Sequence, residues 1–473
     1  MALRCSLVGI ALSIVVAYGL YIALGINGLS ATSSNVQQYK TLLPTGHRHA
    51  DTGVFHAKHQ APGTVAGGIP DLPTSSQRQE EQRAILLAQL QSSRSSVAGR
   101  KGSRYRLLTA LYGFCRYEEV NFNEVERVES LYAKVPSSQR KMIERGLNYT
   151  SNFAKARELF SLNRHLVDDI VRHALEYYEL SEDELNTFIN VVESDKENAL
   201  RPDRTSVSQA LKHVVREWSL DGQHERLATF PCVLGTLQEL CAGPVDRAAG
   251  IPVKVLLPGA GLNRLAHEIA SLDSLSSRLE VTTNEFSPYM NTVYQYLLTL
   301  QIHSSLYFHP YPDNWSHQPT LAELHRGVHA PDILPSHTKA NVTLVEGDFT
   351  QAFHARQWTA SQDVLITHFF IDTARNLFSY LETIHRLLKP GGIWINVGPL
   401  LWSHNAQLQL SLEEVVKLSE SVGFEFLESH ARCGDRTLPQ LTVRSIYAPY
   451  GFNHRTLSQN AYKAQFWVAR KGR

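Results

Sequence analysis

The sequence predicts an α/β fold with a Rossmann-like parallel sheet, and two stretches of the chain carry this prediction. In the first, an apolar run of strand length (253–258) meets a Gly259-x-Gly261 turn, and a helix-period pattern of apolar residues follows directly. In the second, a strand pattern (363–370) precedes a helix-period stretch (377–388) and another apolar strand (393–397). Strands that alternate with helices are typical of parallel sheets.

The glycine turn predicts a pocket for a nucleoside-containing cofactor at the carboxyl end of this sheet. Gly259 and Gly261 lack a Cβ, so the backbone can turn sharply and a ligand can approach it closely. Glu285 follows the next strand pattern, and a carboxylate there can accept hydrogen bonds from both hydroxyls of a ribose. The dinucleotide fingerprint needs a third glycine where this chain has Arg264, which disfavours a nicotinamide-dependent oxidoreductase.

The C-terminal half narrows the class of cofactor. The helical stretch ends in Lys389-Pro-Gly-Gly392, because proline and glycine do not continue a helix. A helix, a Leu-Leu-Lys-Pro-Gly-Gly stop and a buried strand are typical of the seven-stranded methyltransferases that use S-adenosylmethionine. Two more strand patterns (438–447 and 461–469) fit the antiparallel pair that completes such a sheet. We therefore expect a seven-stranded Rossmann-like methyltransferase sheet.

Longer motifs make the resemblance closer than this superfamily. They are Val215-Arg-Glu-Trp-Ser219, Pro258-Gly-Ala-Gly-Leu-Asn-Arg-Leu265, Asn284-Glu-Phe-Ser287, Gly347-Asp-Phe349, Phe369-Phe-Ile-Asp-Thr-Ala374 and Pro390-Gly-Gly-Ile-Trp-Ile-Asn-Val-Gly-Pro-Leu-Leu401. With these blocks the chain, from about Tyr105 to the C-terminus, resembles the carnosine N-methyltransferase family. That family moves a methyl group from S-adenosylmethionine to an imidazole nitrogen of carnosine, giving anserine. The resemblance implies an N-methyltransferase with a small histidine-containing peptide as its substrate.

The resemblance also implies roles for residues around the cofactor. Gly259 and Gly261 would line its methionine end, and Glu285 would hold its ribose. Asp348 would accept the adenine amino hydrogens, while Phe349 packs on the ring. The alternative for Glu285 is a solvated acid at the end of a strand, and the alternative for Asp348 is a helix N-cap.

Four further positions on the cofactor side comprise one match to the family pattern and three departures from it. Arg216 matches the family arginine that reaches the cofactor, where it can pair with the carboxylate. His213 replaces a family glutamine and His368 replaces a small residue, although we expect both to line the cofactor. Asn263 replaces a glycine in the turn. A degenerate protein that binds the cofactor without turnover is therefore an alternative.

Asp372 is the best candidate for substrate alignment and catalysis. A neutral imidazole attacks through one nitrogen, so its ring N–H needs an acceptor that fixes the tautomer. A carboxylate at the carboxyl end of a strand can be that acceptor; a helix N-cap is the alternative. The family resemblance adds His404 as a base or substrate contact, one place after the family's column, and Tyr462 as a substrate contact on the final strand. Another imidazole substrate, such as a protein histidine, stays open.

Composition excludes some partners. The net charge is +1 and no basic stripe carries interleaved aromatic residues, so nucleic acid is not an expected partner. Five scattered cysteines without a Cys-x-x-Cys pair indicate neither a zinc site nor a disulfide framework. The stretch 303–337 holds six histidines, but their spacing does not favour a metal site, and it is interpreted as an insertion that covers the substrate.

The N-terminal part differs in composition from the rest. Residues 5–26 carry no charge and have about the length that crosses a bilayer, so 1–26 is predicted as a signal anchor of a single-pass membrane protein. Cleavage after Ala23-x-Gly25 would instead give a secreted or organellar form. Residues 27–100 are predicted as a flexible linker, 101–250 as a helical cap and 251–473 as the methyltransferase domain. Three glycosylation sequons (Asn148, Asn314, Asn341) are near chance and do not settle the topology.

Overall fold

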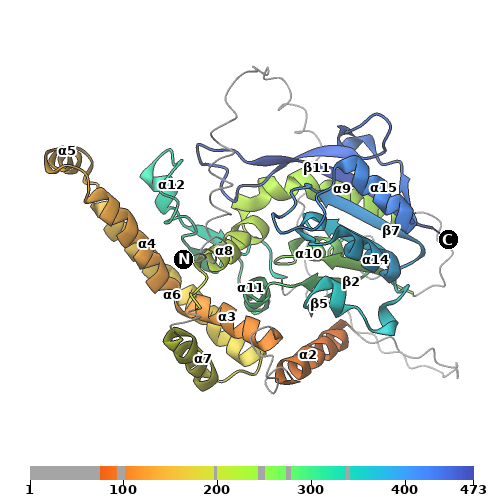
Figure 1. Ribbon diagram of the computed structural model, residues 1–473, viewed down its shortest axis with the longest axis horizontal. Coiled ribbons are helices and arrows are strands. Elements are labelled where there is room, and N and C mark those ends of the chain that lie inside the picture. Colours follow the sequence, from red (N-terminus) through yellow and green to blue (C-terminus); the bar gives the residue numbers. More distant parts are fainter. Residues whose placement is uncertain are drawn as a thin grey trace, which may run out of the picture. The chain divides into compact units, whose positions relative to one another are not determined.

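A mixed β-sheet flanked by helices forms the centre of the molecule (Figure 1). The computed structural model describes residues 75–92, 102–195, 200–242, 251–272, 279–335 and 341–472. All of these lie in one compact unit, Asp71–Arg473. The predicted signal anchor and most of the predicted linker lie outside the described residues.

The strand order of the sheet is that of a Rossmann-like methyltransferase. Five parallel strands come first: β5 (Val342–Glu346), β2 (Leu279–Glu285), β1 (Val253–Pro258), β6 (Gln362–His368) and β7 (Leu388–Gly398). The antiparallel strands β11 (Ala461–Lys471) and β10 (Arg444–Pro449) follow. The strand order reverses at β1, and in open α/β sheets ligands bind outside the carboxyl ends of the strands at such a point.

The expected fold class needs two corrections. Within the described residues the sheet has nine strands rather than seven, because β9 (Asp435–Arg436) extends it beyond β10 and β8 (Phe424–Leu427) pairs with β11. Both strands are too short for a period-2 pattern to reveal. The membrane-length helix also finds no support, since no helix in the described part of the chain is long and apolar enough to cross a membrane.

Alternate residues of the central strands supply two separate cores. Val255 and Leu257 pack with Phe230 and Val233 of α9 (Gln223–Ala242) and with α10 (Arg264–Ala270). Leu256 faces the opposite way, toward α14 (Leu377–Leu387) and α15 (Leu412–Val422). Successive side chains of a strand point to opposite faces, so helices on both sides bury both faces of the sheet.

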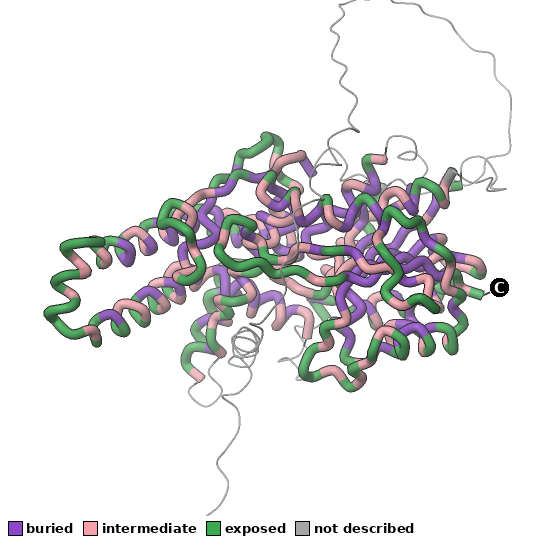
Figure 2. The backbone as a smooth tube through the Cα atoms, turned by 90° about the horizontal axis from the view of Figure 1, so that it is seen from above, coloured by how far each residue is buried: buried purple, intermediate pink, exposed green. Residues whose placement is uncertain are grey.

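A group of helices precedes the sheet, and its core also includes residues of the sheet region such as Leu262, Tyr294 and Phe308. Its helices are α3 (Ser103–Cys115), α4 (Tyr117–Tyr132), α5 (Ser137–Leu147), α6 (Ser151–Tyr177), α7 (Glu182–Ser194) and α8 (Arg204–Trp218). Asp203 is the N-cap of α8 and accepts a hydrogen bond from Ser206 N. The helices α4 and α6 form a long pair that carries α5 at its outer end (Figure 1). Buried residues fill the sheet region, whereas that outer end is exposed (Figure 2).

Smaller elements complete the fold. A helix within the predicted linker, α2 (Ser75–Ser92), lies against the edge strand β5, and Gln79 Nε2 donates to Val342 O at 2.6 Å. The histidine-rich stretch forms β3 (Leu306–Phe308), α12 (Leu321–His325) and β4 (Val328–Ala330). Two helices follow strands at the carboxyl edge of the sheet: α11 (Pro288–Leu297) after β2 and α13 (Phe349–Ala352) after β5.

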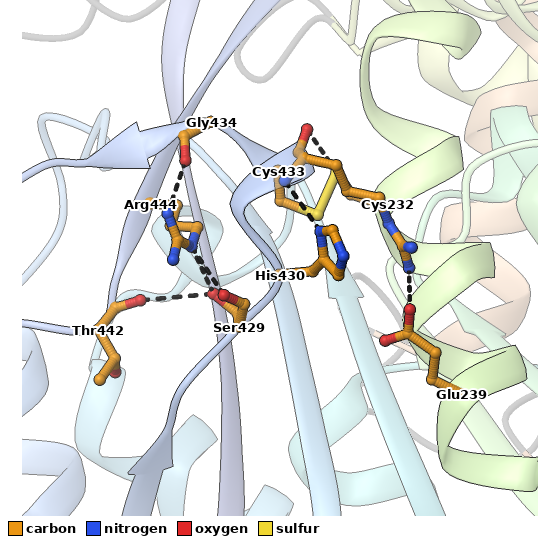
Figure 3. Close-up of a disulfide and its surroundings, with 9 residues drawn as sticks. Cys232, Glu239, Ser429, His430, Cys433, Gly434, Thr442 and Arg444 are labelled. Atoms are coloured by element: carbon orange, nitrogen blue, oxygen red, sulfur yellow. Dashed lines mark hydrogen bonds and ion pairs between the residues drawn. A yellow bond between two sulfur atoms is a disulfide. The ribbon is translucent and has the colours of Figure 1, made fainter.

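A disulfide joins two segments that are far apart in the sequence. Cys232 in α9 is bonded to Cys433, 201 residues away in the short 3-10 helix Ala431–Cys433 (Figure 3). The prediction that the cysteines form no disulfide was therefore wrong. The spacing of cysteines along a chain does not show which of them meet when a helix packs on a sheet.

Candidate active site

The glycine turn after β1 has the strained geometry that only glycine adopts readily. Gly259 and Gly261 have φ angles of +63° and +57°. A Cβ on Gly259 would lie 2.2 Å from Phe370 Cδ2, and one on Gly261 would lie 2.8 Å from Glu217 Oε1. Both the conformation and the close neighbours therefore require glycine at these two positions.

Glu285 lies at the carboxyl end of β2, beside the turn, as predicted. Its Oε2 accepts a hydrogen bond from Gly261 N at 2.9 Å and its Oε1 accepts one from Ser287 N at 2.8 Å. Burial raises the pKa of Glu285 above its ordinary value. Each carboxylate oxygen can accept more than one hydrogen bond, so Glu285 can still bind two hydroxyl groups.

The cap helix α8 holds the other side of the turn through two residues whose role the sequence analysis missed. The Glu217 carboxylate accepts hydrogen bonds from Leu262 N at 3.0 Å and Arg264 N at 3.3 Å. Trp218 Nε1 donates to Leu262 O at 2.9 Å. Both residues belong to the motif Val215–Ser219. The sequence signal for Glu217 was an acidic residue directly after Arg216, the predicted cofactor contact.

Arg264, in place of the third glycine of the dinucleotide fingerprint, belongs to a buried ion-pair cluster. Its Nη1 donates to Asp332 Oδ1 at 2.5 Å and to Glu217 O at 2.7 Å. Arg226 Nη2 donates to the other oxygen of Asp332 at 2.6 Å. The helix that follows the turn is therefore fixed by charge pairing rather than by close glycine packing.

Arg216 presents an unpaired donor in the cavity under the turn. Its Nε donates to Glu225 Oε2 at 2.7 Å, and its guanidinium lies over the rings of Tyr450 and Phe452, 3.7 and 3.9 Å from their centroids. Glu225 Oε1 accepts hydrogen bonds from the backbone of residues 451 and 452. Nη2 of Arg216 is buried and has no hydrogen-bond partner in the described part of the chain. A carboxylate is the ligand group that such a guanidinium pairs with best.

Two histidines of the cavity wall are neutral at pH 7. Nδ1 of His213 lies 2.8 Å from Glu217 Oε1, and burial lowers the pKa of His213. Nε2 of His368 lies 2.9 Å from Thr229 Oγ1, and burial lowers the pKa of His368 to about 4. Both line one cavity together with Arg216 and the two glycines of the turn. The structure thus brings five of the predicted cofactor residues into one wall.

Two predicted adenine contacts lie outside that wall. Asp348 is exposed, and its Oδ1 accepts hydrogen bonds from Thr350 N and Thr350 Oγ1 at 2.8 and 2.6 Å, which makes it the N-cap of α13. Phe349 is buried and packs edge-on against Phe370 and Tyr380. Their roles toward adenine stay predictions.

The predicted substrate residues lie on three different segments. Asp372 is buried in the 3-10 turn Ile371–Thr373 after β6, and its Oδ2 accepts a hydrogen bond from Leu401 N at 3.1 Å. Burial raises the pKa of Asp372 to about 6. Tyr462 contacts the rings of Phe369 and Tyr450, both of which line the cavity. His404 is exposed in the loop after β7, and the cavity lining includes none of the three predicted residues.

The strand order, the glycine turn and the carboxylate beside it define a Rossmann-like fold with a site for a nucleoside-containing cofactor, and the family model identifies the class as an S-adenosylmethionine-dependent N-methyltransferase. The residues present fit that cofactor: glycines that permit close approach, an acid for hydroxyl groups and an orphaned guanidinium for a carboxylate. The family model described as "Carnosine N-methyltransferase" matches residues 193–473. The chain belongs to this family.

Relatives from distant organisms agree with this assignment. The carnosine N-methyltransferase of Rattus norvegicus is 28% identical over 76% of this chain and 83% of its own length. The enzyme of Schizosaccharomyces pombe is 29% identical over 56% of this chain and 70% of its own. A solved Haemonchus contortus phosphoethanolamine N-methyltransferase 2 aligns with a TM-score of 0.32 and 15% identity over 58% of this chain and 59% of that chain.

Proposed function

We propose that this chain methylates an imidazole nitrogen of carnosine or a related histidyl dipeptide, giving anserine in the case of carnosine. The observation that carries the proposal is the buried carboxylate of Asp372 at the carboxyl end of β6, next to the strand that ends in the glycine turn. The names of the curated relatives support the substrate class.

The chemistry needs an aligned nucleophile more than a strong base. When bound, S-adenosylmethionine supplies a methyl group on a positively charged sulfur. Asp372 can accept the N–H of a neutral imidazole, which leaves the lone pair of the other nitrogen free to form the new N–C bond as the S–C bond breaks. The proton on the first nitrogen then passes to the carboxylate. With its pKa raised to about 6, Asp372 is ionised at pH 7 and still basic enough to take that proton.

The residues that line the cavity support binding of the cofactor rather than proton transfer. Arg216 can pair with a carboxylate at the methionine end, and the rings of Phe369 and Tyr450, stacked at 5.1 Å, give the cavity an apolar wall. His213 and His368, neutral at pH 7, add no positive charge beside the sulfonium.

A product assay with the full chain tests the proposal. Methyl-labelled S-adenosylmethionine is incubated with carnosine, other histidyl dipeptides and a histidine-containing protein substrate, and the mass of each product is measured. We expect labelled methyl on the imidazole of a dipeptide. The variant Asp372→Asn should lose transfer, and Asp435→Asn, an exposed aspartate of β9, should keep it.

Calorimetric titration with S-adenosylmethionine distinguishes the ways in which the proposal can fail. Cofactor binding without transfer to any imidazole compound would identify the degenerate alternative. Transfer to protein histidine alone would keep the chemistry and refute the dipeptide as substrate.

A further inference from the structure

The buried disulfide carries information about the compartment in which this chain folds. Cys232 and Cys433 are 7% and 1% exposed, with their Cα atoms 5.6 Å apart. The helix and the loop that they join are also linked by an ion pair between Arg432 and Glu239 at 2.7 Å (Figure 3). Disulfides form and persist in oxidising compartments and are rare in proteins of the cytosol.

One of the three sequons can carry a glycan in the folded chain. Asn148 is exposed at the C-cap of α5 in the left-handed conformation (φ 48°, ψ 47°), and Thr150 is also exposed. The helix α5 has no buried residue and lies at the outer end of the α4–α6 pair (Figure 1). A bulky sugar attached there meets solvent on all sides.

The other two sequons are less accessible. Asn314 is half-buried, and its Oδ1 accepts a hydrogen bond from Lys212 Nζ at 3.4 Å. Asn341 is half-buried directly before β5, and its sequon partner Thr343 is 3% exposed within that strand. The residue after Asn341 is held by the helix α2, because Gln79 Nε2 donates to Val342 O.

We propose that this chain matures in an oxidising compartment of the secretory pathway, where Cys232 and Cys433 are joined and Asn148 receives an N-linked glycan. This inference goes beyond the proposed reaction and does not depend on its substrate. It also means that the methyl donor must be carried into that compartment.

Each modification is a balanced reaction with a co-reactant of known chemical class. The two thiols transfer two electrons and two protons to a disulfide donor, a protein of the compartment that is itself reduced to a dithiol. The Asn148 amide nitrogen displaces the diphosphate of a lipid-linked oligosaccharide at the anomeric carbon. A C–N bond forms, the C–O bond to the diphosphate breaks and the amide loses one proton.

Digestion with a glycosidase specific for N-linked glycans tests the modification of Asn148. The full chain is expressed in eukaryotic cells and its electrophoretic mobility is compared before and after treatment. We expect a shift for the wild type and for Asn314→Gln, and none for Asn148→Gln or for Thr150→Ala, which removes the sequon without touching the asparagine. A wild type that does not shift, or a shift that persists in Asn148→Gln, would overturn the proposal.

Peptide mapping after alkylation under non-reducing conditions tests the disulfide in the same preparation. We expect the peptides that contain Cys232 and Cys433 to be recovered as one linked species. Cys115, a half-buried cysteine outside the disulfide, is the internal control and should be alkylated after unfolding. Alkylation of both Cys232 and Cys433 would overturn the proposal even if a glycan were found.

Discussion

The cofactor side and the substrate side of the proposed site lie at the ends of neighbouring strands but are held in different ways. On the cofactor side, the turn after β1 is hydrogen-bonded from both directions, by Glu285 from the sheet and by Glu217 and Trp218 from the cap. On the substrate side, the hydrogen bond from Leu401 N and contacts between aromatic rings hold Asp372 and Tyr462. The cofactor side is thus preorganised by backbone hydrogen bonds, whereas the substrate side is built from side chains of separate segments.

This difference predicts where variants change catalysis and where they change binding. A substitution on the substrate side should lower kcat and leave cofactor affinity intact. A substitution at the turn should act first on cofactor affinity. The following four variants test this separation.

Asp372→Asn should have the largest effect, lowering kcat about 10²–10⁴-fold because the proton acceptor is lost. In the wild type, kcat should fall as the pH drops below about 6, since burial raises the pKa of Asp372 to about 6 and the protonated carboxyl cannot accept the ring proton. The variant should lack this acidic limb of the pH profile of kcat. Kinetics at saturating substrate from pH 5 to 8 measure both effects, and an unchanged limb in Asp372→Asn would assign it to another group.

Gly259→Ala should weaken S-adenosylmethionine binding more than tenfold and lower Tm. Its Cβ would lie 2.2 Å from Phe370 Cδ2, in addition to the strain at a φ of +63°. Gly391→Ala is the matched control, because at a φ of +76° its Cβ would meet no atom within 4 Å. The control should show only backbone strain of about 1–2 kcal/mol. Calorimetric titration and thermal unfolding compare the two, and equal losses of affinity would contradict a steric role for Phe370.

Glu217→Gln should raise the KM for S-adenosylmethionine about tenfold with little change in kcat. An amide nitrogen cannot accept from Leu262 N or Arg264 N, so the turn loses a charged acceptor that contributes about 1.5–3 kcal/mol. Glu268→Gln removes only an ion pair of Arg264 at 2.8 Å and should leave the KM for the cofactor near that of the wild type. A fall in kcat without a change in KM would show that Glu217 acts in the chemical step.

His404→Ala should have the smallest effect, a fall of about two- to tenfold in kcat/KM for carnosine. The side chain is exposed, and one hydrogen bond to the substrate contributes about 0.5–1.5 kcal/mol. Steady-state kinetics with carnosine measure the change. A loss as large as that of Asp372→Asn would give His404 a catalytic role and remove the contrast between the two residues.

Local patterns predicted the parts of the fold that are continuous in sequence. The strand, turn and helix around Gly259 and the acid at Glu285 lie where the sequence placed them. The strand predicted after Lys389-Pro-Gly-Gly392 is present but begins earlier, at Leu388, and includes that segment. Hydrophobic period and glycine geometry act over a few residues, so they can be read from the chain.

Features that depend on distant segments were missed. Glu217 meets the turn only because α8 packs on it across 45 residues, and Cys232 meets Cys433 across 201. Arg264 stands where the dinucleotide fingerprint has its third glycine, which the sequence shows. Nothing in the sequence near Asp332 indicates that this residue is its carboxylate partner. Asp348 shows the converse: its place in the sequence predicted a cofactor contact, and in the structure its carboxylate caps a helix.

The cluster of Arg264, Arg226 and Asp332 has a consequence for how this branch of the family can diverge. Removing Asp332 alone would take the ion pair from the buried Arg226 and leave Arg264 with Glu268 as its carboxylate partner, which costs more than the pair itself contributes. Positions 264 and 332 are therefore expected to change together in evolution.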